Sequence, residues 1–106
     1  MPDEPISPPP EDLLERVEQA FMRRIGARIR ELRLARGFTQ ADLSKVHGIT
    51  TQYISQAENG AESLSAPSAV RIAVALGVEP YELYLEPSGE DPEPPKRKKP
   101  LPPPLP

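Results

Sequence analysis

A chain of 106 residues is long enough for one small domain, and 14 of its 16 prolines lie in residues 1–10 and 86–106. Cysteine is absent, which excludes disulfides and thiolate metal sites, and the single histidine, His47, cannot form a metal site alone. The formal net charge of −3 is unevenly distributed along the chain: residues 1–20 contain six acids and one arginine, whereas residues 21–60 contain seven Lys or Arg and three acids. The basic middle segment therefore suits a phosphate-bearing partner.

The prolines predict where the folded domain begins and ends. Proline fixes φ, removes a backbone donor and breaks helices and sheets, so residues 1–10 and 87–106 are expected to be disordered and residues 11–86 to form the domain. No apolar run approaches the length of a membrane span, and the acidic N-terminus is unlike a signal peptide. A cytoplasmic location, associated with the nucleoid if the domain binds DNA, is therefore expected.

A long amphipathic helix is predicted from Glu11 to Arg36, because apolar residues recur there at three- and four-residue steps. Gly26 interrupts this pattern, so the segment is predicted to be either one helix or two helices joined near Arg23–Gly26. Gly37 follows the last turn and is expected to end the helix. The apolar stripe consists of Leu13, Leu14, Val17, Ala20, Phe21, Ile25, Ile29 and Leu32.

Two short helices are predicted in the middle of the chain. Thr39 is expected to cap a helix over Gln40–Val46, and Thr50 is expected to cap a second one over Thr51–Glu58. The intervening His47-Gly48-Ile49 is typical of a tight turn, in which a glycine can adopt a positive φ.

A fourth helix and a last helical turn are predicted after Asn59-Gly60. Ser65 can cap a helix that runs through Leu76, with Pro67 tolerated in its first turn. Pro80–Leu85 is expected to form one more short helical turn. Since no segment alternates with period two, no sheet is predicted, and the expected fold class is all-α.

The stretch QADLSKVHGITTQYISQAEN, residues 40–59, has the pattern of two short helices that cross steeply over a three-residue turn. Such a crossing needs a small residue where the axes approach, which Ser44 supplies, and a glycine in the turn, which Gly48 supplies. The inward-facing aliphatic residues would be Leu43, Ile49 and Ile54.

This pattern resembles the Cro/repressor-type helix-turn-helix family, also called lambda-repressor-like or XRE-like. IGARIRELRLARGFTQADL is similar to the first helix of that family and the entry to the second, ISQAENG to the end of the recognition helix, and AVRIAVALGVEPYEL to the fourth and fifth helices. The resemblance covers about Arg24 to Leu85. It implies a compact five-helix domain, here with an N-terminal helical extension and proline-rich tails.

The resemblance implies double-stranded DNA as the partner and assigns a role to several side chains. Glutamine can bond bidentately to adenine, and a threonine methyl can pack on a thymine methyl. Arg33 and Glu58 match a partly buried ion pair that ties the first helix to the recognition helix. The base-reading positions would be Thr50, Thr51, Gln52 and Gln56, and the phosphate-contacting positions Thr39, Gln40, Tyr53 and Asn59.

Two apolar surfaces are candidates for a homodimer contact. In the C-terminal turn, some residues must complete the core and the others match the usual dimer surface of the family; they include Tyr81, Leu83, Tyr84 and Leu85. The stripe within Asp12–Met22 also needs a cover, which could be the core of the domain, a second copy or another partner.

Three hypotheses for function follow from these patterns. The first is a homodimeric transcriptional regulator that reads an inverted-repeat operator. The others are an antitoxin whose tail wraps a toxin, and an adaptor that uses the fold for protein contact. The adaptor stays open because no Lys or Arg comes directly after Asn59, where the loop is Ala61-Glu62-Ser63. No enzyme activity, metal or cofactor is expected, because no paired carboxylates, nucleophile–base set or phosphate-binding glycine loop is present.

The C-terminal KRKKPLPPPLP has two further interpretations besides a solvated tail. Arg97, Pro100 and Pro103 fit the spacing of a polyproline ligand for an SH3-like groove, which would make the tail a site for a protein partner. The basic cluster could equally add non-specific attraction to DNA.

Overall fold

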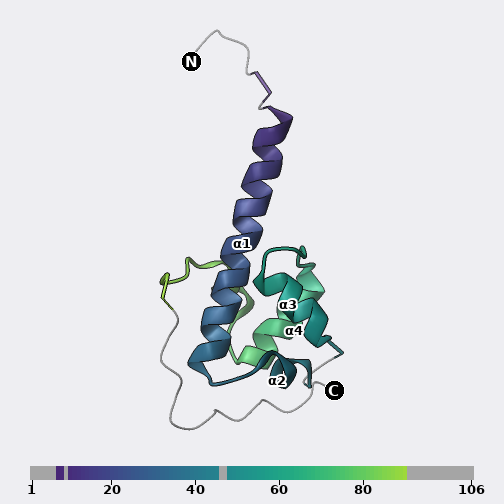
Figure 1. The fold of residues 1–106 in the computed structure, drawn as a ribbon, viewed down its shortest axis with the longest axis vertical. Helices are drawn as coiled ribbons and strands as arrows, with labels where there is room; N and C mark the ends of the chain where they lie inside the picture. The colour runs from purple at the N-terminus through teal and green to yellow at the C-terminus, as the bar shows by residue number, and fades with distance from the viewer. Residues whose placement is uncertain (1–6, 9, 46–47, 91–106) are drawn as a thin grey trace.

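The computed structural model describes residues 7–8, 10–45 and 48–90, and the regular secondary structure within those ranges consists of helices alone. The all-α prediction is therefore confirmed, although the fifth predicted helix is a 3-10 helix. Figure 1 shows a long first helix with the shorter elements gathered along its C-terminal half. The elements are α1 (Glu11–Ala35), α2 (Gln40–Ser44), α3 (Thr51–Glu58), α4 (Ala66–Leu76) and the 3-10 helix η1 (Pro80–Tyr84).

α1 is one continuous helix of 25 residues, so the alternative of two helices joined near Arg23–Gly26 is wrong. Gly26 lies where α1 crosses the C-terminal end of α3. A Cβ atom at this position would overlap the carbonyl oxygens of Ala57 and Glu58. The glycine thus permits close approach of two helices, and its presence in the sequence does not mark a break.

Replacing Gly26 by alanine is expected to destabilise the fold although alanine is the better helix former. The substitution gains about 1 kcal/mol of helix propensity, but the methyl group must push α1 away from the backbone of α3, and overpacking of this kind costs about 3 kcal/mol. A net loss of about 2 kcal/mol in the free energy of unfolding is expected by urea denaturation. A Gly26→Ala chain more stable than wild type would contradict the tight crossing, and Ala27→Ser, on the exposed neighbouring position, is the control.

The three predicted helix N-caps are present. The Thr39 hydroxyl accepts from the amide of Asp42 at 3.1 Å, and the Asp42 carboxylate accepts in return from the amide of Thr39 at 2.8 Å. The Thr50 hydroxyl accepts from the amide of Tyr53 at 3.0 Å, and Ser65 caps α4 in the same way. Side chains of the predicted type therefore fix where α2, α3 and α4 begin.

Gly48, which precedes α3, has the predicted positive φ, at +57°. α2 ends at Ser44, earlier than the predicted Val46. Val46 and His47 lie outside the described residues. α3 covers the predicted Thr51–Glu58.

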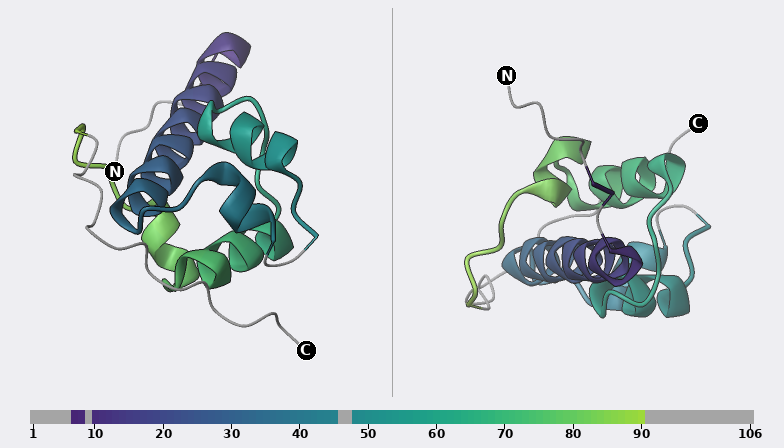
Figure 2. Two further views of the ribbon diagram at one scale, coloured as in Figure 1. Left: turned by 60° about the horizontal axis from the view of Figure 1, so that its bottom comes forward. Right: turned by 90° about the horizontal axis from the view of Figure 1, so that it is seen from above.

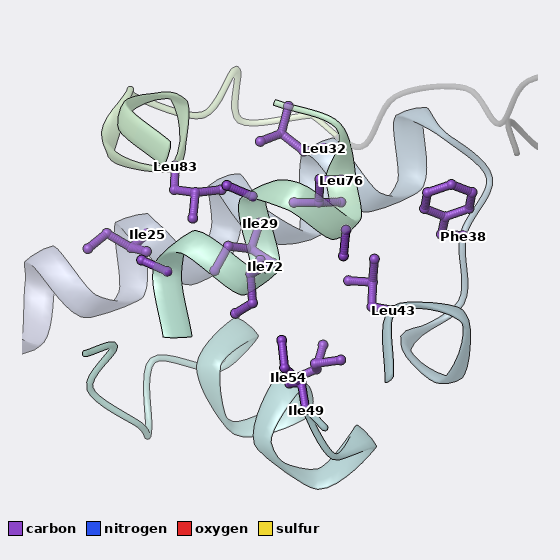
Figure 3. Packing of buried hydrophobic residues seen from close by; sticks show 13 residues of the cluster. Ile25, Ile29, Leu32, Phe38, Leu43, Ile49, Ile54, Ile72, Leu76 and Leu83 are labelled. Carbon is purple, nitrogen blue, oxygen red and sulfur yellow. The ribbon is translucent and has the colours of Figure 1, made fainter. Parts of the chain in front are cut away.

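The core lies between α1 and the other four elements (Figure 3). Ile29 of α1, Ile72 of α4 and Leu83 of η1 are fully buried at its centre. Leu83 thus completes the core, and burial removes it from the surface that the sequence offered for a dimer contact. The cluster comprises Ile25, Ile29, Leu32, Phe38, Leu43, Ile49, Ile54, Ala69, Ile72, Ala73, Ala75, Leu76 and Leu83.

The N-terminal half of α1 projects beyond the rest of the described chain (Figures 1 and 2). Every residue from Glu11 to Phe21 is exposed. The apolar stripe of this segment is therefore not covered by the core of its own domain, one of the three covers that the sequence left open. At the base of the projection, Phe21 stacks on Tyr84 with ring centroids 6.1 Å apart.

The segment after η1 returns along α1. The amide of Ser88 donates to the Glu31 carboxylate at 2.9 Å, and Arg24 lies 3.8 Å from the Glu86 carboxylate. Residues 87–90 thus contact the domain, although they were assigned to the tail by sequence, and residues 91–106 lie outside the described residues. No helix of the described chain has the length and apolar character needed to cross a membrane.

Candidate nucleic-acid interface

The outer face of α3 is polar and its inner face is apolar. Ile54 and Ala57 are buried against the core. Gln52, Gln56 and Asn59 are on the opposite side, since each is two positions from Ile54 or Ala57 and two positions correspond to a rotation of about 200° around a helix. Gln52 and Asn59 are exposed and Gln56 is half-buried.

The two threonines at the start of α3 use their hydroxyls inside the protein. Thr50 caps the helix, as described above, and the Thr51 hydroxyl donates to the Ser44 hydroxyl at 3.3 Å across the helix-turn-helix crossing. Ser44 is therefore at the close approach of α2 and α3, as predicted. Both threonines are exposed, and since their hydroxyls are used inside the protein, their methyl groups are the main groups left to contact a partner.

The predicted ion pair between α1 and α3 is present and is more buried than expected. Arg33 donates through Nε and Nη2 to the two carboxylate oxygens of Glu58, at 2.7 and 2.8 Å. The two side chains are only 8% and 4% exposed. Arg33 also donates through Nη1 to the carbonyl of Phe38 at 2.9 Å. This guanidinium therefore connects α1, the α1–α2 loop and α3, and it fixes the orientation of α3.

The residues predicted to contact phosphates lie around α3, and the structure gives two of them additional partners. The Gln40 side chain, half-buried at the start of α2, donates to Glu58 at 3.3 Å, which uses one of its two N–H groups. Tyr53 packs against the core, and its hydroxyl lies 3.4 Å from the carbonyl of Ser63. Thr39 and Asn59 are exposed at the starts of α2 and of the α3–α4 loop. Their contact with phosphate stays a prediction.

The cations near α3 come from other elements, because α3 itself contains no Lys or Arg. Lys45, at the end of α2, is 70% exposed and 3.7 Å from Asp42. Arg23 of α1 lies against Gly60, just past the end of α3. Arg71 of α4 is exposed and lines an open pocket of about 210 Å³ together with Thr50 and other residues at the start of α3.

Arg71 was not among the residues singled out from the sequence. It lies 21 positions after Thr50, and only the packing of α4 on the turn before α3 brings the two together. Ser68, three residues earlier on the same helix face, lines the pocket too, but no local sequence signal indicated either residue.

The sequence profile of the helix-turn-helix family matches residues 29–83, which is more than half of the chain. The chain belongs to this family. The resemblance to Cro/repressor-type proteins, inferred from about Arg24 to Leu85, is thereby confirmed. The family segment begins within α1, so the projecting half of that helix lies outside the matched residues.

A curated relative shows the same correspondence. The HTH-type transcriptional regulator RamB of Mycobacterium tuberculosis is 36% identical over 55 residues. These residues make up 52% of this chain but 12% of RamB, so the chain spans only a small part of the length of that relative.

Two solved structures share the helix-turn-helix fold. The restriction-modification controller protein C.AhdI from Aeromonas hydrophila is 35% identical with a TM-score of 0.60, over 61% of this chain and 98% of that one. The hypothetical transcription factor NHTF from Neisseria is 26% identical with a TM-score of 0.61, over 78% of this chain and 87% of that one.

Proposed function

We propose that this helix-turn-helix protein is a transcriptional regulator that binds duplex DNA sequence-specifically through the outer face of α3. The observation that supports the proposal is that packing, capping and an ion pair hold α3 in one orientation, with this face toward solvent. Its inner side is buried, its N-terminus is capped by Thr50, and its C-terminal end is held by the Arg33–Glu58 pair. Exposed amide and methyl groups on a rigid helix that fits the major groove are the chemistry of direct base recognition.

The charge around α3 favours binding as a homodimer. Glu58 is neutralised by Arg33, so the helix presents no net charge, and only a few cations lie at its edges. Phosphate contacts supply much of the affinity of such proteins, and one domain with few of them binds weakly. A two-fold dimer doubles the contacts and places two recognition helices about 34–36 Å apart, which corresponds to an inverted-repeat operator.

Selection from a random duplex library with the purified full chain tests this function. We expect enrichment of an inverted repeat whose half-site centres are about one helical turn, or roughly 10 base pairs, apart. Enrichment of a single half-site would retain base recognition but remove the dimer. Recovery of no preferred sequence would contradict base recognition and favour an adaptor that contacts protein, for which the uncharged face of α3 is the supporting observation.

Arg71 is expected to contact a phosphate at the start of the recognition helix, since its side chain lines the pocket beside Thr50. Arg71→Ala should weaken binding equally on specific and random duplexes. The slope of log affinity against log salt should fall by about 0.9 per bound chain. Titration at several salt concentrations measures both effects, and Arg71→Lys should retain most of the slope. Loss confined to the preferred sequence would instead assign Arg71 to base recognition.

A further inference from the structure

The projecting half of α1 carries an apolar stripe without a cover in the described chain. Leu14 and Val17 are 58% and 56% exposed, and Leu13 and Phe21 are 39% and 41% exposed. Their neighbours in the helix are mainly charged, so the apolar side chains form a discrete line. Large apolar side chains gathered on one face of a helix mark a site of contact.

This stripe continues into an open groove at the base of the projection. The groove, of about 370 Å³, is bounded by Phe21 and Met22 of α1, by Leu64 of the α3–α4 loop and by Tyr84 of η1. Its walls come from three separate parts of the chain, and the stacking of Phe21 on Tyr84 fixes one side. The groove therefore presents an apolar surface that continues the line of exposed aliphatic side chains.

The charge along α1 is unevenly distributed, and this distribution favours one partner for the stripe. Residues 11–20 contain four acids and one arginine, whereas residues 21–30 contain four arginines and no acid. Arg28 is engaged by Glu31 and by the carbonyl of Glu82. Arg24 lies 3.8 Å from Glu86 and 4.9 Å above the Phe21 ring, whereas Arg23 is exposed. A second α1 laid antiparallel about Val17 would bring its Glu11 and Asp12 beside Arg23 of the first copy, whereas a parallel one would set each acidic residue against its own copy.

We propose that the occupant is a second copy of this chain, and that the two α1 helices pair antiparallel with the two-fold axis near Val17. Leu13 and Leu14 of each copy then enter the groove beside Phe21 and Tyr84 of the other. The contact is self-complementary, as a two-fold interface must be, because each copy supplies one stripe and one groove. The proposal deepens the proposed function, on whose dimer it rests, by assigning the contact to a segment outside the family match.

Cysteine cross-linking tests the arrangement directly, because the natural chain has no cysteine. A disulfide needs Cα atoms about 4.4–6.8 Å apart. Val17→Cys is next to the two-fold axis and should cross-link to itself under oxidising conditions. Leu13→Cys should not, because four residues on either side of the axis separate the two copies by about 12 Å along the helices. A mixture of Leu13→Cys and Ala20→Cys chains should give the mixed cross-linked dimer, whereas a parallel pair would cross-link Leu13→Cys to itself.

Sedimentation of the full chain tests the energetic role of the stripe. Leu14→Gln with Val17→Gln should raise the dimer dissociation constant by about 100-fold or more, because each copy loses two buried aliphatic side chains. Both positions are exposed in one copy, so folding should be unaffected. The matched control is Val70→Gln on α4, whose side chain is 43% exposed and outside the stripe and groove.

Three results would overturn the proposal: a wild-type chain that sediments as a monomer with and without its selected DNA, a dimer that the stripe substitutions leave intact, or a dimer broken by Val70→Gln alone. The DNA-binding function is measured separately. The stripe variant should still select the same half-site from a random library, while losing the preference for two half-sites. Loss of half-site selection in the wild-type chain would instead contradict the proposed function and leave the cross-linking result unchanged.

Discussion

Arg33→Ala is expected to lower the free energy of unfolding by about 3–5 kcal/mol. The substitution leaves the Glu58 carboxylate, whose side chain is 4% exposed, without its bidentate partner. It also leaves the carbonyl of Phe38 without the Nη1 donor. A buried charge deprived of its partner cannot recover its hydration, so the penalty far exceeds the net contribution of an exposed ion pair.

Two comparison variants separate this explanation from general loss of charge. Arg16→Ala removes an arginine that pairs with Asp12 at 3.5 Å, where both side chains are more than two-thirds exposed, and should leave the midpoint of urea unfolding unchanged. Arg33→Met combined with Glu58→Leu removes both charges and should recover much of the lost stability. If Arg33→Ala unfolds at the same urea concentration as the wild-type chain, the pair does not hold α1 to α3.

The sequence predicted best those features that depend on neighbouring residues. Thr39, Thr50 and Ser65 were identified as N-caps because a hydroxyl at a helix start bonds an amide three residues later. The same local logic placed the limits of α3. The Arg33–Glu58 pair came from the family resemblance, since nothing local connects residues 25 positions apart.

The features that the sequence missed depend on packing between distant elements. Gly26 looked like an interruption of the helix because the backbone that it accommodates, that of Ala57 and Glu58, is distant in sequence. Arg71 and the Gln40–Glu58 hydrogen bond were missed for the same reason. Composition could not show that Leu83 is buried while Tyr81 is exposed, because both belong to one apolar run. Only packing against the core decides which side chain points inward.

The outer face of α3, which we propose to read bases, gives the expected result of greatest consequence for function. Gln52→Ala and Gln56→Ala should each reduce affinity for the preferred duplex by about 1–3 kcal/mol, and the double variant by about 2–6 kcal/mol if the two side chains read separate base pairs. One helical turn separates the two glutamines on the outer face of α3, so both can reach base edges from one groove. Neither supports the core, and stability should not change.

Fluorescence anisotropy with the selected duplex and with a random duplex of equal length measures the result. The double variant should bind the random duplex as tightly as the wild-type chain, because neutral side chains contribute little to phosphate attraction. Ser63→Ala, on the exposed loop after α3, is the matched control and should bind both duplexes unchanged. An equal loss on both duplexes would place the glutamines on the phosphate backbone. An unchanged affinity on both would remove α3 as the reading element and leave the protein-contact function as the better account of this surface.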